Sequence, residues 1–319
     1  MRHLAIGRKT LWRLLRITGL LAGLGFMAWL LARLLTDPKL LKSQFAAEGF
    51  VEAIVIGVVA NAVIAIAFSD MVGKYAPDIG FGKRITAYYY AQIAKYIPGK
   101  IAALMVQRSV LSGQSGTVAT IASNLELMAI SSWLCGNAAL VLLAWPQSKT
   151  GAVALMLAAI ASGAWLLRVD WWRVLRLALS CIPKYSNLAV PPRAKRQIPR
   201  LRTVVLSSVI LVLPAASSYF LLVNGLGIEH ELALRLCALL LLSWVAGLLA
   251  FIFPAGIGIR EFIFFALGGV FMQVPDTALM AGIALASRVA QILIDVVGVV
   301  LFVACRGWLV FAGSTHDKH

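Results

Sequence analysis

The sequence predicts an all-α polytopic membrane protein, and three observations support that fold class. Of the 319 residues, 61% are hydrophobic and 13% are charged, and the mean hydropathy is +0.88. Soluble domains contain about 45–50% apolar and about 25% charged residues. Several apolar runs reach the length of about 20 residues that a membrane-spanning helix needs. The 29 Lys and Arg residues, which outnumber the 13 Asp and Glu residues, gather in a few connections between those runs. This composition excludes a soluble enzyme, a disordered chain and a coiled coil.

The apolar runs give the order of the expected helices. Residues 14–35 follow a basic start and are longer than the core of a signal peptide, so they are expected to form an uncleaved first helix. Further spanning helices are expected at 50–68, 117–144, 151–167, 204–224, 232–252 and 276–305. Residues 85–109 and 253–274 are ambiguous, because Pro and Gly interrupt both runs. The sequence therefore predicts about seven or eight transmembrane helices and one or two re-entrant segments formed by broken helices.

The distribution of Lys and Arg decides the first ambiguous segment. Five cations before residue 17 place the N-terminus in the cytoplasm under the positive-inside rule. If residues 85–109 enter and leave on the cytoplasmic side, the cytoplasmic connections carry 17 cations and the outer connections carry 4. If they cross, the nine cations of 168–203 lie outside, against the rule. Residues 85–109 are therefore predicted to be re-entrant. For 253–274, a re-entrant segment puts the end of the last helix outside, and a crossing segment puts it in the cytoplasm.

The helices are expected to form one integral membrane domain over residues 1–319, with a two-fold repeated organisation. Its halves, about 1–167 and 204–305, are joined by the basic cytoplasmic segment 168–203. Residues 168–182 interleave Trp and Leu with Arg, which is typical of a helix in the headgroup layer or of a cytoplasmic extension of the preceding helix. The following PPRAKRQIPR is a solvated linker or a patch that contacts anionic lipid. No nucleic-acid-binding fold accompanies these cations, so nucleic acid is not an expected partner.

The first broken segment contains the sequence KYIPGK. Pro98 removes a backbone donor and obstructs a helical turn, and Gly99 adopts backbone conformations that other residues avoid. A break at membrane depth leaves backbone polar groups that only protein or water can satisfy, so it indicates a protein-lined pocket or a cavity. Lys95, Lys100 and Arg108 surround this break and are candidate ligands for an anion.

The second broken segment repeats this pattern in the other half of the chain. Its sequence FPAGIGIRE contains Pro254, Gly256 and Gly258, followed by Arg260 and Glu261 at the start of another apolar run. The N-terminus of a half-helix carries partial positive charge and free N–H groups, which suit an anion. Two such segments, one in each half, are the pattern of a binding site near the midplane or the inner leaflet. The alternative is that both are tight turns at the membrane surface with solvated cations.

The last predicted helix carries Arg288, Gln291 and Asp295 on one face, at spacings of three and seven residues. Ionisable residues inside a membrane are costly and usually face a bundle interior or a water-filled path. Arg288 and Asp295 are separated by about 10 Å along the helix axis, which is too far for a direct pair. Each therefore needs another partner. Glu126, in the helix predicted at 117–144, is a candidate acid for Arg288 or for the arginines of the broken segments; the alternative is that it only pins two helices together.

Motifs for cofactors and metals do not occur in the chain. The four Cys residues form no C-x-x-C pair, and the four His residues form no H-E-x-x-H spacing. No G-x-x-x-x-G-K-[ST] motif occurs, so any energy source is expected to be a gradient or the downstream consumption of a product. We therefore expect no cofactor, no metal and no catalytic residue. The scarcity of histidines and clustered carboxylates also disfavours an intramembrane enzyme that acts on a lipid phosphate.

With these motifs the chain resembles the lysylphosphatidylglycerol synthase transmembrane-domain family, which is also called flippase-like. The resemblance rests on KYIPGK with Arg108 downstream, on PAGIGIRE, and on the Ala-rich helix that leads to Arg288. It covers the chain from the second helix to the last. It implies a bacterial or archaeal inner-membrane protein that translocates an aminoacylated phospholipid or works beside lipid-linked sugar or glycosyltransferase systems. The synthases carry a soluble aminoacyl-transfer domain after the membrane region, whereas about 306–319 follow it here, so the chain is not expected to synthesise lysyl-lipid itself.

The expected function is to bind and translocate an anionic or lipid-linked amphiphile, whose phosphate enters a polar cavity from the inner leaflet of the cytoplasmic membrane. The expected substrate-binding residues come from the two broken segments: Lys95, Pro98, Gly99, Lys100, Arg108, Pro254, Gly256, Gly258, Arg260 and Glu261. The polar lining is expected from Glu126, Arg288 and Asp295. The alternative is a non-transporting accessory protein that anchors a glycosyltransferase or a lipid-synthesis enzyme through the segment 168–203.

Overall fold

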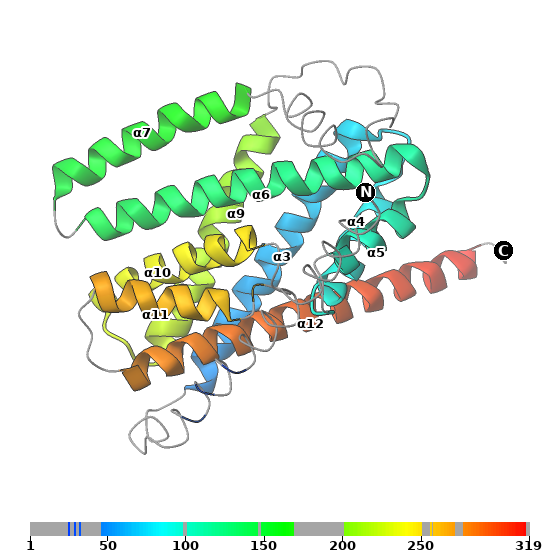
Figure 1. The fold of residues 1–319 in the computed structure, drawn as a ribbon. Helices are drawn as coiled ribbons and strands as arrows, with labels where there is room; N and C mark the ends of the chain where they lie inside the picture. Colours follow the sequence, from blue (N-terminus) through cyan, green and yellow to red (C-terminus); the bar gives the residue numbers. More distant parts are fainter. Residues whose placement is uncertain are drawn as a thin grey trace, which may run out of the picture.

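The computed structural model is all-helical over the residues it describes, which confirms the predicted fold class at that level (Figure 1). The described residues are 46–97, 101–145, 148–168, 201–250, 256, 258–271 and 277–316, together with Gly25, Trp29 and Ala32. Their helices are α3 (Ala47–Tyr75), α4 (Phe81–Ala94), α5 (Ile101–Leu111), α6 (Gly113–Ala144), α7 (Lys149–Arg168), α9 (Leu201–Phe220), the π-helical turn η1 (Leu221–Gly225), α10 (His230–Leu249), α11 (Ile259–Phe271) and α12 (Thr277–His316).

Four of the described helices are long and apolar enough to cross a membrane. They are Ala47–Tyr75, Gly116–Ala144, His230–Leu249 and Leu279–Arg306. These helices lie at the spans predicted for 50–68, 117–144, 232–252 and 276–305, and they support a helical membrane protein. Helices α7 and α9, of 20 residues each, lie at the spans predicted for 151–167 and 204–224.

Two other predictions fall mostly on residues that are not described. Of the first predicted helix, 14–35, the described residues are Gly25, Trp29 and Ala32, and all three are helical. The Trp29 ring contacts the Phe265 ring of α11 edge-on, with centroids 5.9 Å apart. Residues 169–200 lie outside the described residues, and with them the predicted headgroup-layer helix and most of the basic segment on which the accessory-protein alternative depends.

Helix α3 is the centre of the bundle and packs against α4, α6, α9 and α12. Small residues allow the closest of these approaches, as is common between membrane helices. A Cβ atom on Gly49 would lie 2.2 Å from the backbone of Asn224, and one on Gly57 would lie 2.2 Å from the Ile294 side chain. The hydroxyl of Ser217 in α9 donates a hydrogen bond of 2.7 Å to the carbonyl of Ala53. These contacts fix α3 closely between α9 and α12.

Helix α12 carries two shorter helices end to end along its length (Figure 1). The contacts run in order along α12: Met280 with Gly268 of α11, Arg288 with Glu261 of α11, Asp295 with Tyr96 after α4, Phe302 with Tyr89 of α4, and Arg306 with Thr86 of α4. Both α11 and α4 therefore run antiparallel to α12. The C-terminal end of α4 points at the N-terminal end of α11, near the middle of α12.

Two helical hairpins supply these meeting ends. In one, α4 packs against α5, and in the other α10 packs against α11. Helices α4, α5 and α11 contain 14, 11 and 13 residues. At about 1.5 Å per residue they extend only about 16–21 Å, whereas the hydrocarbon core is about 30 Å thick. None of these three helices is long enough to cross a membrane by itself.

The close approach of α3 to η1 predicts a large difference between two glycine substitutions. We expect Gly49→Ala to destabilise the fold by about 1–3 kcal/mol, because its Cβ overlaps the backbone of Asn224, which has no flexible end to move aside. Gly136→Ala in α6 is the matched control, because nothing lies within 4 Å of its Cβ. The midpoint of thermal unfolding in detergent measures both. Equal midpoints for the two variants would contradict the packing described.

Candidate functional site

The carboxylate of Asp295 lies at the centre of a buried polar cluster. Asp295 is 2% exposed and stands near the middle of the spanning part of α12, Leu279–Arg306. Asn61, which contacts it, stands at the middle of α3 and is 5% exposed. A charge at this depth is costly unless protein groups surround it. The cluster therefore lies at the middle of two helices that are long and apolar enough to cross a membrane.

The end of the first hairpin supplies the strongest contacts to Asp295. Lys95, the C-cap residue of α4, places its Nζ 2.7 Å from Oδ2, and the Tyr96 hydroxyl donates to the same oxygen at 2.5 Å. Weaker hydrogen bonds reach Oδ1 from Asn61 Nδ2 at 3.4 Å and from Gln291 Nε2 at 3.3 Å. Both carboxylate oxygens are thus hydrogen-bonded, as buried charges require. Helix α4 is fixed to α12 by one ion pair and one phenol.

The end of the second hairpin is built around Glu261. Gly258 directly precedes α11 with φ +84°, a left-handed conformation that favours glycine, and its N–H donates to Glu261 Oε2 at 2.7 Å. This is the glutamate half of a capping box, in which the side chain at the third helical position satisfies the backbone before the helix. Glu261 Oε1 lies 3.8 Å from Arg288 Nε, an ion pair too long for a hydrogen bond. The N-terminus of α11 therefore already holds a carboxylate of its own chain.

Gly256 brings the connection of the second hairpin against α10. Its φ is +69°, and a Cβ there would lie 2.9 Å from the Cα of Gly247. A side chain at Gly256 would push the two backbones apart. The contact fixes the residues before α11 against α10 and aims the first turn of α11 at α12.

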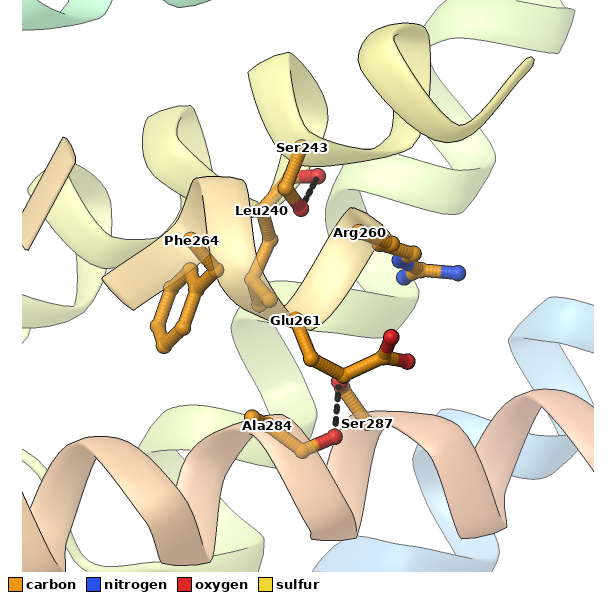
Figure 2. Close-up of a pocket in the computed structure, with 7 residues that line it drawn as sticks. All are labelled: Leu240, Ser243, Arg260, Glu261, Phe264, Ala284 and Ser287. Carbon is orange, nitrogen blue, oxygen red and sulfur yellow. Dashed lines mark hydrogen bonds between the residues drawn. The ribbon is translucent and has the colours of Figure 1, made fainter. Parts of the chain in front are cut away.

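Arg260 differs from the other cations of the cluster. It is half-buried and lies close enough to Tyr96, Arg288 and Asp295 to interact electrostatically with all three. Its guanidinium makes no hydrogen bond or ion pair within the part of the chain that the structure describes. Figure 2 shows its head group extending from the first turn of α11 to the same side as the Glu261 carboxylate. The cluster has a surplus of one positive charge, because it contains three basic residues (Lys95, Arg260 and Arg288) and two acidic ones (Glu261 and Asp295).

A small pocket of about 160 Å³ lies beside Arg260 (Figure 2). Its lining residues come from α10, α11 and α12, and they are Leu240, Ser243, Arg260, Glu261, Phe264, Ala284 and Ser287. Its 160 Å³ counts all the space between the atoms, open solvent included, and no room for a water molecule remains inside it. In this conformation the hairpin ends are closed on α12, and the pocket is too small for a lipid headgroup.

Glu126 belongs to a separate cluster. Its carboxylate accepts from Lys74 Nζ at 2.9 Å and from the Tyr75 hydroxyl at 2.7 Å, both at the end of α3. Among the described residues, the basic partner of Glu126 is thus a lysine and not one of the arginines predicted from the sequence. The same two residue types in the same order, Lys95 and Tyr96, bind Asp295. Sequence reasoning missed both tyrosines, although each directly follows a lysine near a helix end.

The structure brings together five of the ionisable residues that the sequence predicts: Lys95, Arg260, Glu261, Arg288 and Asp295. Gly256 and Gly258 form the backbone beside them. Arg108 is exposed on α5 and Glu126 lies in the other cluster. Four further predicted residues lie outside the described residues: Pro98, Gly99, Lys100 and Pro254.

Neither a metal site nor a known relative accounts for the cluster. Within the described ranges, no group of three or more His, Cys, Asp or Glu side chains is placed to hold a metal ion. Comparison with family models, with curated proteins and with solved structures finds no match to the chain. The function must therefore be argued from the chemistry of the cluster.

The burial of Asp295 predicts that its removal is far more costly than the removal of an exposed acid. Asp295→Ala leaves the Lys95 ammonium and three hydrogen-bond donors without their acceptor, and we expect a loss of about 3–5 kcal/mol of stability. Glu231→Ala is the control, because its pair with Arg235 is exposed on α10 and is worth about 0.3–0.5 kcal/mol. Denaturant unfolding in mixed micelles measures both values. A similar loss for the two variants would show that Asp295 is solvated.

Proposed function

We propose that the protein is a flippase-like membrane protein that binds an anionic or lipid-linked amphiphile and translocates it across the cytoplasmic membrane. The observation that carries this proposal is the Arg260 guanidinium, which has no hydrogen-bond partner among the described residues and lies between the ends of two broken segments. A positive group in a low-dielectric site strongly attracts an anion. A guanidinium also binds phosphate oxygens two at a time. A phosphate headgroup at Arg260 would balance the surplus positive charge of the cluster.

The topology that accompanies this proposal is an inverted repeat. Ala53, Gly57 and Asn61 of α3 face Ala290, Ile294 and Asp295 of α12 in the same order, so α3 and α12 run parallel. Hairpin α4–α5 approaches the cluster from the end at which α12 finishes, and α10–α11 approaches from the end at which α12 begins. We infer two re-entrant hairpins that enter from opposite faces, each between two spanning helices. Discontinuous helices of this kind form substrate sites near the midplane of many transporters.

The side of the C-terminus follows from the same topology. Arg306 of α12 donates to Thr86 of α4 at 3.0 Å, so the end of α12 lies beside the start of the first hairpin. With a cytoplasmic N-terminus, residues 69–84 and the end of α12 are then both cytoplasmic. This side of the C-terminus is the one that a crossing segment 253–274 also gives, but in this inference α10 and α11 enter and leave on the outer face, and neither of them spans.

Entry of a headgroup requires the hairpin ends to separate from α12, because the present pocket is small. The chain provides a means of separation that depends on the ligand. An anion competes with Glu261 for Arg288 and for the Gly258 N–H group, and it competes with Asp295 for Lys95. The binding of the headgroup would thus weaken both contacts that hold the hairpins closed. The resemblance to the flippase-like family rests on the same broken segments.

The assignment of Arg260 to the anion predicts a specific loss of lipid movement. In vesicles of phosphatidylcholine that contain fluorophore-labelled phosphatidylglycerol, we expect Arg260→Ala to slow headgroup exposure at least tenfold. A hydrogen bond to a charged group contributes about 1.5–3 kcal/mol, which corresponds to that factor or more. Arg260→Lys should retain part of the rate, because it keeps the charge and loses the two-point contact.

Two further arginines complete this test. Arg235→Ala removes a half-buried arginine of α10 that pairs with Glu231 outside the cluster, and it should leave the rate unchanged. Arg108→Ala distinguishes the exposed position on α5 from the buried cluster, and we expect a smaller loss than for Arg260→Ala. If Arg260→Ala moves labelled lipid as fast as the parent, the anion does not bind at Arg260.

A further inference from the structure

Asp295 and Lys95 differ sharply in their access to water, although they form one ion pair. The Lys95 side chain is 31% exposed and that of Asp295 is 3% exposed. Lys95 stands at the C-terminal end of α4 and has a second partner, Gln92 Oε1, at 2.7 Å. Asp295 is fixed within the long helix α12. A ligand that enters from the side can therefore take Lys95 away, whereas Asp295 stays in place.

The departure of Lys95 changes the electrostatic state of Asp295. A buried carboxylate without its counter-charge neutralises itself by binding a proton, because desolvation of the charged form is very costly. The Tyr96 hydroxyl leaves with Lys95, since both belong to the same end of the first hairpin. Asn61 and Gln291 remain, and they donate hydrogen bonds that a protonated carboxyl still accepts on one oxygen.

The other charged and titratable groups near Asp295 support this exchange. Tyr88 of α4 donates to Asn61 and interacts electrostatically with Asp295. Arg260 of α11 and Arg288 of α12 also lie within electrostatic range of the cluster. In the proposed function the anionic headgroup pairs with Arg260, and its negative charge offsets the surplus positive charge of the cluster. The headgroup therefore weakens the positive potential around Asp295.

We propose that Asp295 is a proton-binding site and that the protein carries one proton together with each anionic headgroup. This inference rests on the proposed function and names its coupling ion. Lys95 keeps its own proton and pairs with the headgroup, and a proton from water binds a carboxylate oxygen of Asp295. The headgroup and the proton leave together on the other side, after which Lys95 returns to Asp295. One negative and one positive charge cross in each cycle, so the movement is electroneutral and a proton gradient drives it.

The test measures lipid and protons in the same vesicles. The wild-type protein is reconstituted in phosphatidylcholine vesicles with fluorophore-labelled phosphatidylglycerol and a pH-sensitive dye in the lumen. We expect a lumenal pH change that accompanies lipid movement, with about one proton per lipid, and no pH change when the labelled lipid is zwitterionic phosphatidylcholine. Asp295→Asn keeps the shape and lacks the titratable group, so whatever lipid it moves should move without protons and without response to a pH gradient.

A matched control comes from the second lysine–tyrosine pair. Glu126 accepts from Lys74 and Tyr75 as Asp295 accepts from Lys95 and Tyr96, and in both pairs the lysine Nζ also lies over the ring of the adjacent tyrosine, at 5.3 Å and 5.5 Å. Glu126 has the same kind of partners but lies outside the cluster that binds the headgroup. Glu126→Gln should therefore keep the proton-to-lipid ratio of the parent, even if it changes the stability.

The outcomes separate the two proposals. If the wild-type protein moves labelled phosphatidylglycerol without protons, proton coupling is overturned and the proposed function stands. If Asp295→Asn keeps the parental ratio, a different group binds the proton and the inference is wrong. If the wild-type protein moves no anionic lipid at all, both proposals are overturned. Should Asp295→Asn fail to fold, the proton-to-lipid ratio of the wild-type protein decides the question alone.

Discussion

The buried carboxylate of Asp295 is the constraint on which the arrangement around α12 depends. A charge near the middle of a spanning helix is tolerated only with protein partners on every side. Those partners come from three places in the chain: the end of α4, the middle of α3 and the preceding turn of α12. The first hairpin therefore ends where it does because Lys95 and Tyr96 must reach this carboxylate. The small residues of α3 then let the backbones approach closely enough for Asn61 to reach it as well.

The hydrogen bond of Glu261 fills a helix end that the sequence pattern predicts to be open. A glycine-rich break before a half-helix predicts an open anion site, because backbone N–H groups are left without partners. Here the same segment contains a glutamate three residues after Gly258, and its carboxylate occupies that position. In the proposed function this carboxylate competes with the headgroup. The headgroup would have to interact more strongly with Arg288 and the helix end than this carboxylate does, which favours phosphates over weaker anions.

Much of this arrangement could be predicted from the sequence, and the physical reasons are specific. Apolar length located the spanning helices, and the cost of buried charge singled out Arg288 and Asp295 as residues that need partners. The partners themselves were not predictable, because they depend on the relative positions of packed helices along their axes. Glu126 reaches Lys74 and Tyr75 at the end of α3, and Lys95 reaches a helix 200 positions away. No pattern along the chain encodes such distances, whereas the ends of α4 and α10 and the start of α11 depend on local sequence and lie close to the interruptions that Pro and Gly predict.

The glycine contact between α10 and the second hairpin makes the two hairpins mechanically unequal. Gly256 rests on Gly247 backbone to backbone, so no side chain takes part in that contact. The first hairpin, in contrast, is attached to α12 through the long, flexible ends of Lys95 and Tyr96. Separation of α4 from α12 therefore needs only side-chain rotations, whereas separation of the residues before α11 from α10 would need the backbones themselves to move.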